Sequence, residues 1–403
     1  MRVLALNAGS SSLKAAAFDV QSAPRAGEAP RGRVWSAESR GDAGVLGELL
    51  APVLRGSVDP AFTAVQPIDI IGHRIVHGGA RLRDAVLITP LILDEIAAAS
   101  EHAPAHNALA LDVVRATILL FGDDVPHVAV FDTAFHKTLE PAAYAYAGPF
   151  DWIAQGIRRL GFHGINHEYV SQRAIALRGR RTAGSRIVTC HLGSGCSLAA
   201  IHDGRSVDTT MGFTPLDGLP MAHRSGAIDP GILLHLLRSG AHTVATLDQL
   251  LQEQSGLAGL SGTTGDMRIV LDGIDAGDAR CRLAFDVFVH HVRKGIAAMA
   301  ASMAGLDVLV FTGGVGEHSP RVRSAICSSL DFLGITLCPD RNLDATGESD
   351  LSAATSGAGV FVIPAEENWM IAQASVRVAA SSVHSRNPTP SARPGSAGGR
   401  RLN

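Results

Sequence analysis

Two short segments of this chain share one pattern 184 residues apart, and this repeat constrains the fold more than any other feature. Each segment, residues 4–19 and residues 187–203, has an apolar run, a Gly/Ser turn and a second apolar run. The aligned pairs are Gly9 with Gly193, Ser10 with Ser194, Ala15 with Ala199, Ala16 with Ala200, and Asp19 with Asp203. Such a turn directs main-chain N–H groups and hydroxyls outward, which suits phosphate oxygens. Two copies predict a duplicated fold whose lobes hold a nucleotide between them.

The composition is that of an ordinary globular protein. The 403 residues are 46% hydrophobic and 18% charged, and this length predicts two or three domains. A net charge of −3 supplies no strong positive field, so we exclude nucleic acid and an anionic membrane as partners. No uncharged apolar run is long enough for a membrane span. The five cysteines form no CxxC pair and the first residues lack a signal-peptide pattern, so we expect reduced thiols in a cytoplasmic protein.

Apolar runs that read as buried strands alternate with stretches of helical spacing, which predicts an α/β fold. The expected strands are residues 3–7, 68–76, 127–132, 187–190, 308–312 and 360–364. The expected helices include residues 90–100, 107–121, 230–239 and 281–304. Residues 22–60 carry less signal, and we expect a surface excursion with a short helix there.

The same pattern predicts the domain organisation. We place an N-terminal lobe at residues 1–148 and a C-terminal, nucleotide-binding lobe at residues 149–367. A helix over about residues 368–381 is expected to pack back onto the first lobe. Residues 382–403 contain too few apolar side chains to bury a core, which predicts a disordered tail.

Polar side chains stand where two of the expected strands end. Asn7 closes the first apolar run, and Asp132 closes the run that starts at residue 127. Because α/β proteins bind ligands at the carboxyl ends of their strands, both are candidate site residues. Asp132 could instead cap the next helix, and Asn7 could be an ordinary turn residue. Lys14 and the neighbouring serines favour a site.

Two arginines are candidate anion ligands. Arg74 lies among apolar residues of an expected strand, where a guanidinium is costly unless it is paired or binds an anion. A salt bridge is the alternative explanation. Arg224 precedes the helix expected from Pro230, and a planar guanidinium there could grip a carboxylate or phosphate. The two arginines could converge on one small anion from opposite sides.

Three further patterns point to a ligand. His163 stands between glycines, so its ring could approach a ligand closely, although most single histidines are ordinary core or surface residues. Residues 311–318 form a Gly-rich run after a strand, which could lie against a phosphorylated ligand. The chain has neither GxGxxG spacing in this run nor a GxxxxGK[ST] motif, which excludes a Rossmann fingerprint and a P-loop. Glu366 and Glu367 are candidate Mg²⁺ ligands or helix-capping acids.

Together these segments resemble the acetate kinases, in order and spacing, from residue 1 to about residue 380. The motifs are NAGSSSLK (7–14), GHRIVHGG (72–79), FDTAFH (131–136), GFHG (161–164), HLGSGCS (191–197), GFTPLDGLPM (212–221), SGAIDP (225–230), FTGGVGE (311–317) and FVIP (361–364). The resemblance implies two duplicated actin-like, ribonuclease H-like lobes with a nucleotide cleft between them. It also implies reversible phosphoryl transfer from ATP to acetate, giving acetyl phosphate and ADP, with Mg²⁺ or a substituting Mn²⁺. The implied state is a cytoplasmic homodimer.

The resemblance also assigns roles to residues of this chain. The implied catalytic residues are Asp132, His163 and Arg224, and the implied metal residues are Asn7 and Glu367. The implied substrate residues are Arg74, Val76, Ala105, Phe162 and Pro215. The implied nucleotide residues are Ser10, Ser12, Lys14, His191, Leu192, Gly193, Ser194, Gly195, Asp266, Met267, Arg268, Gly314, Val315, Gly316, Glu317 and His318.

The chemistry agrees with these roles. Acetate is already a carboxylate at neutral pH and needs no base, so the difficulty is the approach of two anions. Arg74 would orient the carboxylate, while Arg224, His163 and Mg²⁺ would spread the charge of the transferred group during direct in-line attack. Asp132 would orient an arginine or a metal-bound water. The alternatives are a kinase for propionate or another short carboxylate, and a nucleotide-driven switch without transfer chemistry, which would need no paired arginines.

The chain departs from the family pattern at six positions. Ser194 stands in place of asparagine, Cys196 of serine, Asn166 of serine, His223 of threonine, Glu366 of asparagine, and Ala105 of an acyl-pocket leucine. The last change predicts a roomier pocket that accepts propionate better. Each extra buried CH₂ contributes about 0.8 kcal/mol, roughly a fourfold preference.

Overall fold

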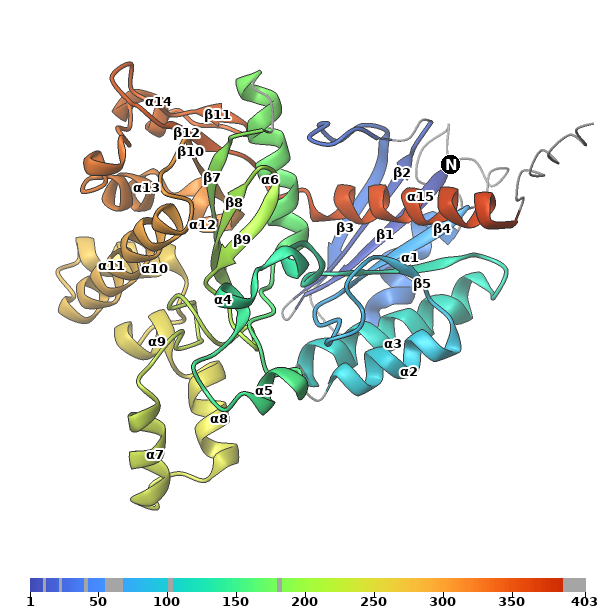
Figure 1. Cartoon of the computed structure of the whole chain (residues 1–403), viewed down its shortest axis with the longest axis horizontal. Helices are drawn as coiled ribbons and strands as arrows, with labels where there is room; N and C mark the ends of the chain where they lie inside the picture. The colour runs from blue at the N-terminus through green and yellow to red at the C-terminus, as the bar shows by residue number, and fades with distance from the viewer. Residues whose placement is uncertain are drawn as a thin grey trace, which may run out of the picture.

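The computed structural model describes residues 1–9, 12–21, 24–39, 43–54, 68–100, 104–179 and 183–386, with the main chain alone for residues 43, 104–106 and 382–386. Two six-stranded sheets form its framework (Figure 1). The first contains β1 (Arg2–Ala8), β2 (Leu13–Asp19), β3 (Arg33–Ser39), β4 (Ile70–Ile75), β5 (Val86–Leu87) and β6 (His127–Phe131). The second contains β7 (Arg186–Leu192), β8 (Cys196–His202), β9 (Arg205–Thr209), β10 (Val308–Thr312), β11 (Ser349–Asp350) and β12 (Gly359–Val362).

The two sheets have the same topology. Their strand orders are β3-β2-β1-β4-β6-β5 and β9-β8-β7-β10-β12-β11. In each sheet the first three strands pair antiparallel, the next two are parallel to the first, and a short edge strand runs antiparallel. This duplication confirms the two-lobed α/β fold expected from the repeat.

The two repeated hairpins differ by one residue in their turns. In the first hairpin Asn7 pairs with Lys14, and in the second His191 pairs with Ser197, so the second turn is one residue shorter. The offset of 184 therefore holds for β1 and β7, but β8 matches β2 at an offset of 183. The register irregularities at Ala17/Phe18 and Ala200/Ile201 also lie at this offset. The alignments of Ala15 with Ala199, Ala16 with Ala200 and Asp19 with Asp203 were therefore wrong by one position, because the shorter second turn starts β8 one residue earlier.

Helices flank and separate the sheets. They are α1 (Leu46–Leu54), α2 (Pro90–Ala99), α3 (Pro104–Phe121), α4 (Pro141–Tyr144), α5 (Asp151–Ala154), α6 (Gly164–Arg178), α7 (Pro230–Arg238), α8 (Val244–Glu253), α9 (Gly256–Ser261), α10 (Met267–Asp275), α11 (Ala279–Ser302), α12 (Gly313–His318), α13 (Pro320–Cys327), α14 (Pro339–Leu343) and α15 (Glu367–Arg386). The short 3₁₀ segments are η1 (Ala43–Val45), η3 (Ala134–Thr138) and η4 (Asp331–Leu333). None of the helices in the described part of the chain is long and apolar enough to cross a membrane.

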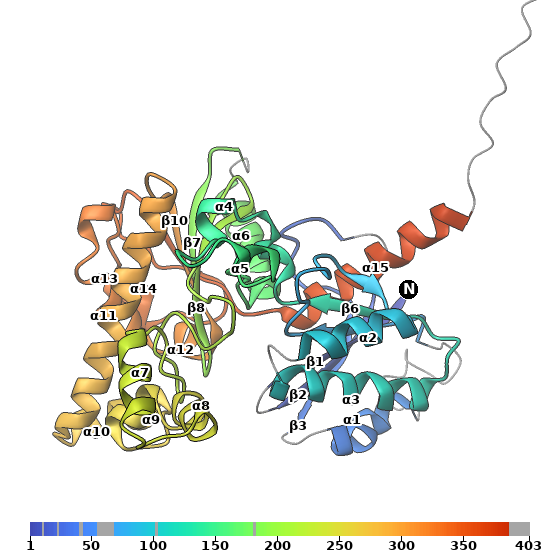
Figure 2. The ribbon, with the colours of Figure 1, turned by 60° about the horizontal axis from the view of Figure 1, so that its bottom comes forward.

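Helices α6 and α15 lie where the two sheets face each other (Figures 1 and 2). One apolar core joins residues of both sheets to these helices, and the fully buried Trp369 of α15 is among them. The indole N–H of Trp369 donates to the main-chain oxygen of Glu28 at 3.1 Å. Helix α15 also contacts β1 and β4 of the first sheet. The C-terminal helix thus joins the two lobes through shared packing.

The expected strands and the four expected helices at residues 90–100, 107–121, 230–239 and 281–304 are present, and their ends differ from the expected ones by at most three residues. The segment expected to be a surface excursion contains a strand that was not predicted, β3, which pairs with β2. Its side chains alternate only between exposed and half-buried, so the apolar pattern that marks the other strands is absent. Helix α15 continues to Arg386, past residue 382 where we expected the tail to begin. Residues 387–403 lie outside the described residues, and the lobe boundary at 148/149 stays a prediction.

The contact between α15 and β4 depends on a glycine. A methyl group added at Gly72 would lie 2.3 Å from the Ser375 hydroxyl oxygen and 2.6 Å from a side-chain carbon of Ile371. We expect Gly72→Ala to lower the free energy of unfolding by about 1–3 kcal/mol, as overpacking of a filled core does. The matched control is Gly47→Ala on α1, where nothing lies within 4 Å, and which should gain about 0.5–1 kcal/mol. Urea unfolding of both variants is the measurement; equal stability of the two would contradict the packing argument.

Candidate active site

Four polar side chains meet at the carboxyl edge of the first sheet. Asn7 lies in β1, Arg74 in β4, and Asp132 follows β6, and the parallel course of these strands brings their ends together. The Arg74 guanidinium donates from Nε and Nη2 to Asp132 at 3.0 and 2.5 Å, and from Nη1 to the Asn7 side-chain oxygen at 2.9 Å. The Asn7 amide donates to Glu367, the first residue of α15, at 2.6 Å. All four side chains are buried or nearly so.

The charges of this cluster stabilise one another. Burial opposes the charge on Arg74, but Asp132 and Glu367 raise its pKa above the ordinary value, so it stays protonated. Burial alone would raise the pKa of Glu367, but Arg74, His191 and the Asn7 amide lower it below the ordinary value. Arg74 uses three of its five N–H groups within the cluster, and the remaining two are available to a ligand. The salt bridge that was the alternative explanation for Arg74 is therefore present, and it leaves two N–H groups of Arg74 for a ligand.

His163 and Arg224 converge from the second lobe over Gly195. A methyl group added at Gly195 would lie 2.7 Å from Nη2 of Arg224 and 3.2 Å from Nε2 of His163. His163 caps α6 with a left-handed backbone (φ 55°), and its ring stacks on that of His191 at a centroid distance of 4.1 Å. Only glycine permits both side chains to approach the turn this closely.

Arg224 differs from Arg74 in its electrostatics. Its Nη1 donates to the main-chain oxygen of Pro215 at 2.7 Å, and it has no carboxylate partner among the described residues. Burial lowers its pKa, with only the Cys196 thiol opposing that effect. A largely desolvated cation without a counter-ion gains from the arrival of an anion.

A chain of hydrogen bonds determines which nitrogen of His163 carries the proton. The Ser197 hydroxyl lies 2.8 Å from His163 Nδ1 and 2.7 Å from His167 Nε2, and the Thr189 hydroxyl lies 2.7 Å from His167 Nδ1. Burial lowers the pKa of both histidines well below 6.5, so each ring is neutral and has one N–H. In one direction the Thr189 hydroxyl donates to Nδ1 of His167, Nε2–H of His167 donates to Ser197, and the Ser197 hydroxyl donates to Nδ1 of His163. Every proton of these three hydrogen bonds then has an acceptor. The opposite direction leaves the buried Thr189 hydroxyl without one among the described residues, which is costly. His163 therefore directs an Nε2–H toward Gly195 and the cavity.

Two cavities follow from this arrangement. The smaller, about 420 Å³, lies between the lobes, and the larger, about 1110 Å³, lies in the second lobe. They share Gly193, Ser194, Gly314 and His318, so one runs into the other. Their sizes fit a small-molecule site in two parts.

Most residues expected from the sequence line these cavities. The smaller is lined by Asn7, Ser12, Lys14, Arg74, Val76, Asp132, Phe162, His163, His191, Gly195, Pro215, Arg224, Glu317 and Glu367, besides the shared four. The larger is lined by Asp266, Met267, Arg268 and Val315, besides the shared four. Leu192 and Gly316 are buried and line neither cavity. Ser10 and the side chain of Ala105 lie outside the described residues.

Three of the expected residues have structural partners that the sequence did not indicate. The Glu317 carboxylate accepts from the main-chain N–H of Gly313 at 2.9 Å and of Ala365 at 3.0 Å, joining the Gly-rich run to the segment before α15. Glu366 forms an ion pair with Arg33 of β3 and does not line the smaller cavity, so only Glu367 faces it. Lys14 lies 3.9 Å from Glu38, and both are half exposed.

Other residues of the site were missed from the sequence. Ser197 and His167 orient His163, and the i,i+4 spacing of His163 and His167 on one helix was an available signal. Asn166, one of the departures from the family pattern, donates to His191 Nδ1 at 2.8 Å. Thr264 and Arg321 line the larger cavity, and neither belongs to a pattern that points to a ligand.

The duplicated sheets with cavities between them define a two-lobed α/β protein with actin-like halves. Residues 56–373 match the model of the acetokinase family. An acetate kinase of Trichormus variabilis is 47% identical over 398 residues, covering 93% of this chain and 98% of the relative. The crystal structure of Porphyromonas gingivalis acetate kinase superposes with a TM-score of 0.82 at 34% identity, covering 94% and 99% of the two chains. A propionate kinase of Francisella tularensis superposes with a TM-score of 0.81 at 33% identity, covering 94% and 99%. The chain belongs to the acetokinase family.

The hydrogen-bond chain predicts a defect in Ser197→Ala. Without the hydroxyl, His163 can protonate Nδ1 and present a lone pair to the site, so we expect kcat to fall about 10- to 100-fold, approaching the loss of one charge-stabilising donor. The KM for ATP should change little, and Ser197→Thr, which keeps the hydroxyl, should recover most of kcat. Steady-state kinetics from pH 6 to 8 and urea unfolding provide the measurement. A kcat loss shared equally by both variants, or explained by lost stability, would contradict this role.

Proposed function

We propose that the chain is an acetate kinase, which reversibly transfers the terminal phosphoryl group of ATP to acetate and gives acetyl phosphate and ADP. The observation that carries this proposal is the opposition of two arginines across a small cavity that opens into a larger one; one is paired, and the other has no carboxylate partner among the described residues. Two anions must meet in such a reaction, and this arrangement offers a cation to each. The similar proteins named acetate kinase support the same function.

The carboxylate would bind to the two free N–H groups of Arg74. Asp132 keeps the guanidinium in place and accepts no proton, because acetate is already ionised. Val76, Phe162 and Pro215 supply an apolar wall of the same cavity, which suits a short alkyl group.

The phosphoryl group would be stabilised from the second lobe. Arg224 and the Nε2–H of His163 would donate to its equatorial oxygens, where negative charge accumulates in the transition state. The main-chain N–H groups of Ser194, Gly195 and Gly314 would contact the phosphates, while the larger cavity would hold the nucleoside. Direct in-line attack requires inversion at a chiral γ-phosphate.

Mg²⁺ is the proposed metal, and the donor set fits it. Asn7 and Glu367 offer hard oxygen ligands beside Asp132, and Mg²⁺ favours a few such ligands together with phosphate oxygens and waters. When bound it would neutralise phosphate charge. Asn7 and Glu367 are held in place by their hydrogen bond and by Arg74.

The arginines give the sharpest test of the activity. We expect Arg74→Ala and Arg224→Ala each to lower kcat/KM for acetate by at least about 10²- to 10³-fold, as removal of a charge-stabilising donor does. The control Arg115→Ala on α3, whose side chain is exposed, should match the unmodified chain. Acyl hydroxamate formed from ATP, acetate, hydroxylamine and Mg²⁺ is the readout, with EDTA as a second control. ATP hydrolysis without hydroxamate would contradict the proposal.

Propionate is the second candidate substrate, favoured by the structural likeness to a propionate kinase and by Ala105. If the acyl pocket is roomier, kcat/KM for propionate should equal or exceed that for acetate by up to roughly fourfold, the worth of one buried CH₂. Ala105→Leu should shift the preference toward acetate. Comparing acetate, propionate and butyrate with both proteins measures this, and a tenfold or greater preference for acetate in the unmodified chain would reject the roomier pocket.

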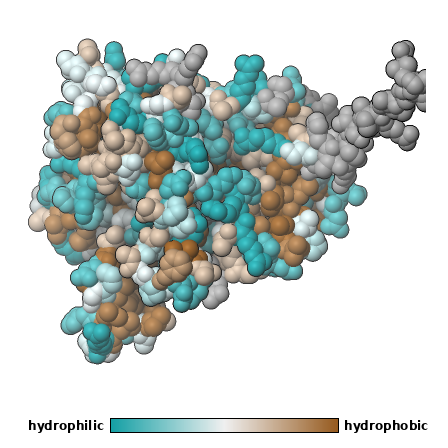
Figure 3. All heavy atoms as spheres, in the orientation of Figure 1, coloured by the Kyte–Doolittle hydropathy of each residue, from teal (hydrophilic) through white to brown (hydrophobic). Residues whose placement is uncertain are grey.

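We further propose a cytoplasmic homodimer. The five cysteines are free thiols, which suits a reducing compartment. Helix α7 has no buried residue although its sequence is largely apolar, and Ile232 and Leu234 are about half exposed. Brown side chains gather on the projecting tip that contains α7 (Figure 3). An apolar helix left uncovered in this way suits burial against a second copy of the chain.

The dimer is tested by a charge on that helix. Leu234→Asp should convert a dimer of about twice the chain mass into a monomer in analytical ultracentrifugation, because an ionised carboxylate resists burial at an apolar interface. Leu119→Asp on α3, at a side chain that is 87% exposed, should leave the mass unchanged. A monomeric unmodified chain would reject the proposal.

A further inference from the structure

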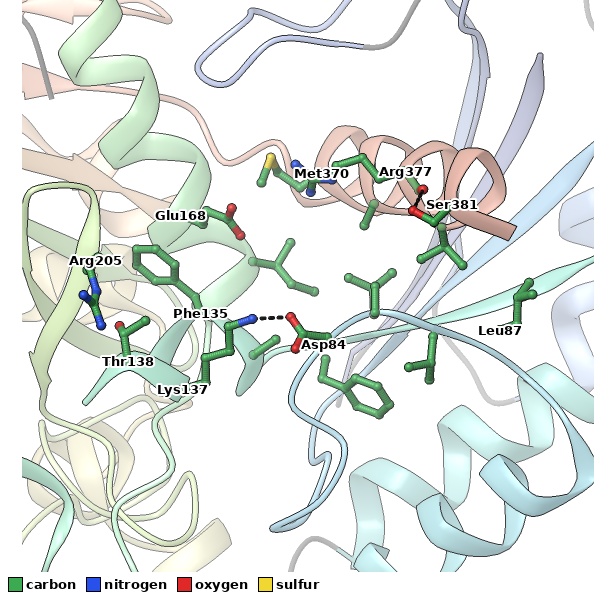
Figure 4. A pocket seen from close by; sticks show the side chains of 18 of the residues that line it. Asp84, Leu87, Phe135, Lys137, Thr138, Glu168, Arg205, Met370, Arg377 and Ser381 are labelled. Carbon is green, nitrogen blue, oxygen red and sulfur yellow. Dashed lines mark hydrogen bonds and ion pairs between the residues drawn. The ribbon is translucent and has the colours of Figure 1, made fainter. Parts of the chain in front are cut away.

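A third cavity, of about 700 Å³, lies between the lobes but apart from the site described above (Figure 4). None of its lining residues lines either of the other two cavities. The walls come from both lobes: β5, β6 and η3 of the first, the turn before β9 in the second, and the helices α6 and α15 between the sheets. An occupant of this space would contact both lobes at once.

The cavity combines an apolar wall with cationic groups. Leu87, Phe135, Ile165, Met370 and Val378 are among the side chains that provide the apolar surface. Lys137 is paired with Asp84, as Figure 4 shows by a dashed line.

Two arginines of the lining have no such pairing. Arg205, in the second lobe, and Arg377, on α15, have no side-chain hydrogen bond or ion pair with any described residue. Glu168 of α6 also lines the cavity; burial raises its pKa, the charge of Arg377 opposes that effect, and its carboxylate accepts from Gln172 at 3.0 Å. Both arginines are exposed, and the lining holds three cationic side chains against the two carboxylates of Asp84 and Glu168, which favours an anion with an apolar body.

The wall of this cavity is also the back of the active site. Phe131 and Ile165 line it and are the chain neighbours of Asp132 and Gly164. The main-chain N–H of Gly164 donates to the main-chain oxygen of Asp132 at 2.8 Å, so the strand end of one lobe is tied to the helix start after His163. The cavity wall is therefore continuous with both sides of the catalytic cleft.

We propose that this cavity is a regulatory site for an organic anion with an aliphatic body, which bridges Arg205 and Arg377 and slows turnover. A ligand that contacts both lobes stabilises the arrangement that forms its cavity, and it therefore opposes the relative motion of the lobes that each catalytic cycle uses. This effect rests on the proposed kinase function; binding itself does not.

Decanoate is the probe, and decanol is its uncharged control. Calorimetry of the full chain with saturating ADP, Mg²⁺ and acetate should detect decanoate binding, and decanol should bind about tenfold more weakly or worse. Arg205→Ala/Arg377→Ala should weaken decanoate binding at least about tenfold, whereas the control Arg115→Ala/Arg341→Ala should not. Ala374→Trp, which fills the cavity and keeps both arginines, should abolish binding. In the hydroxamate assay decanoate should lower kcat without raising the KM for ATP or acetate.

Three results would overturn the proposal. They are no decanoate binding, equal binding by the double arginine variant, and displacement of decanoate by acetate or nucleotide, which would place it in the catalytic cleft. Because calorimetry needs no phosphoryl transfer, a chain that binds decanoate in this way but forms no hydroxamate would reject the kinase function and leave the site standing.

Discussion

The bidentate pair between Arg74 and Asp132 is the interaction on which the rest of the site depends. It holds a cation inside the first lobe by giving it an internal counter-ion, and it leaves two N–H groups for a ligand. Asn7 and Glu367 extend the pair into a network that contains residues from β1, β4, the end of β6 and α15. Across the cavity, Arg224 has no carboxylate partner in the part of the chain that the structure describes. The charge of Arg74 is stabilised before any substrate binds, whereas the charge of Arg224 is stabilised by the substrate.

The duplicated hairpins have diverged while keeping one architecture. The first turn has four residues between its strands and stands beside Lys14, whereas the second has three, and its last glycine permits Arg224 and His163 to approach. The shorter turn shifts β8 by one residue relative to β2, and Ser197 lies on that strand as the orienting partner of His163. The position of β8 that corresponds to Lys14 of β2 is thus occupied by Ser197, which contacts His163.

Strong local patterns account for what could be predicted. Buried strands such as β10 are continuous apolar runs, and the polar residues at their ends lie together because parallel strands share an edge. The alternating, half-exposed β3 could not be recognised, because its place depends on pairing with β2 and not on its own composition. The partners of Glu317 and Glu366 were equally hidden, since both depend on contacts between distant segments. The direction of the hydrogen bonds through Ser197 could not be predicted either, because it depends on all the groups that surround Ser197, His163 and His167 in the fold.

The placement of α15 has a consequence for how the protein is made. Glu367 and the fully buried Trp369 lie near the end of the chain, yet the first contacts Asn7 and the second packs in the core between both sheets. A chain on the ribosome whose described strands have all been made still lacks α15. It therefore lacks the helix that joins the two lobes and the Glu367 carboxylate of the cleft. The two lobes can therefore be joined by shared packing only after α15 has been synthesised, and a chain truncated before Glu367 would lack that joint.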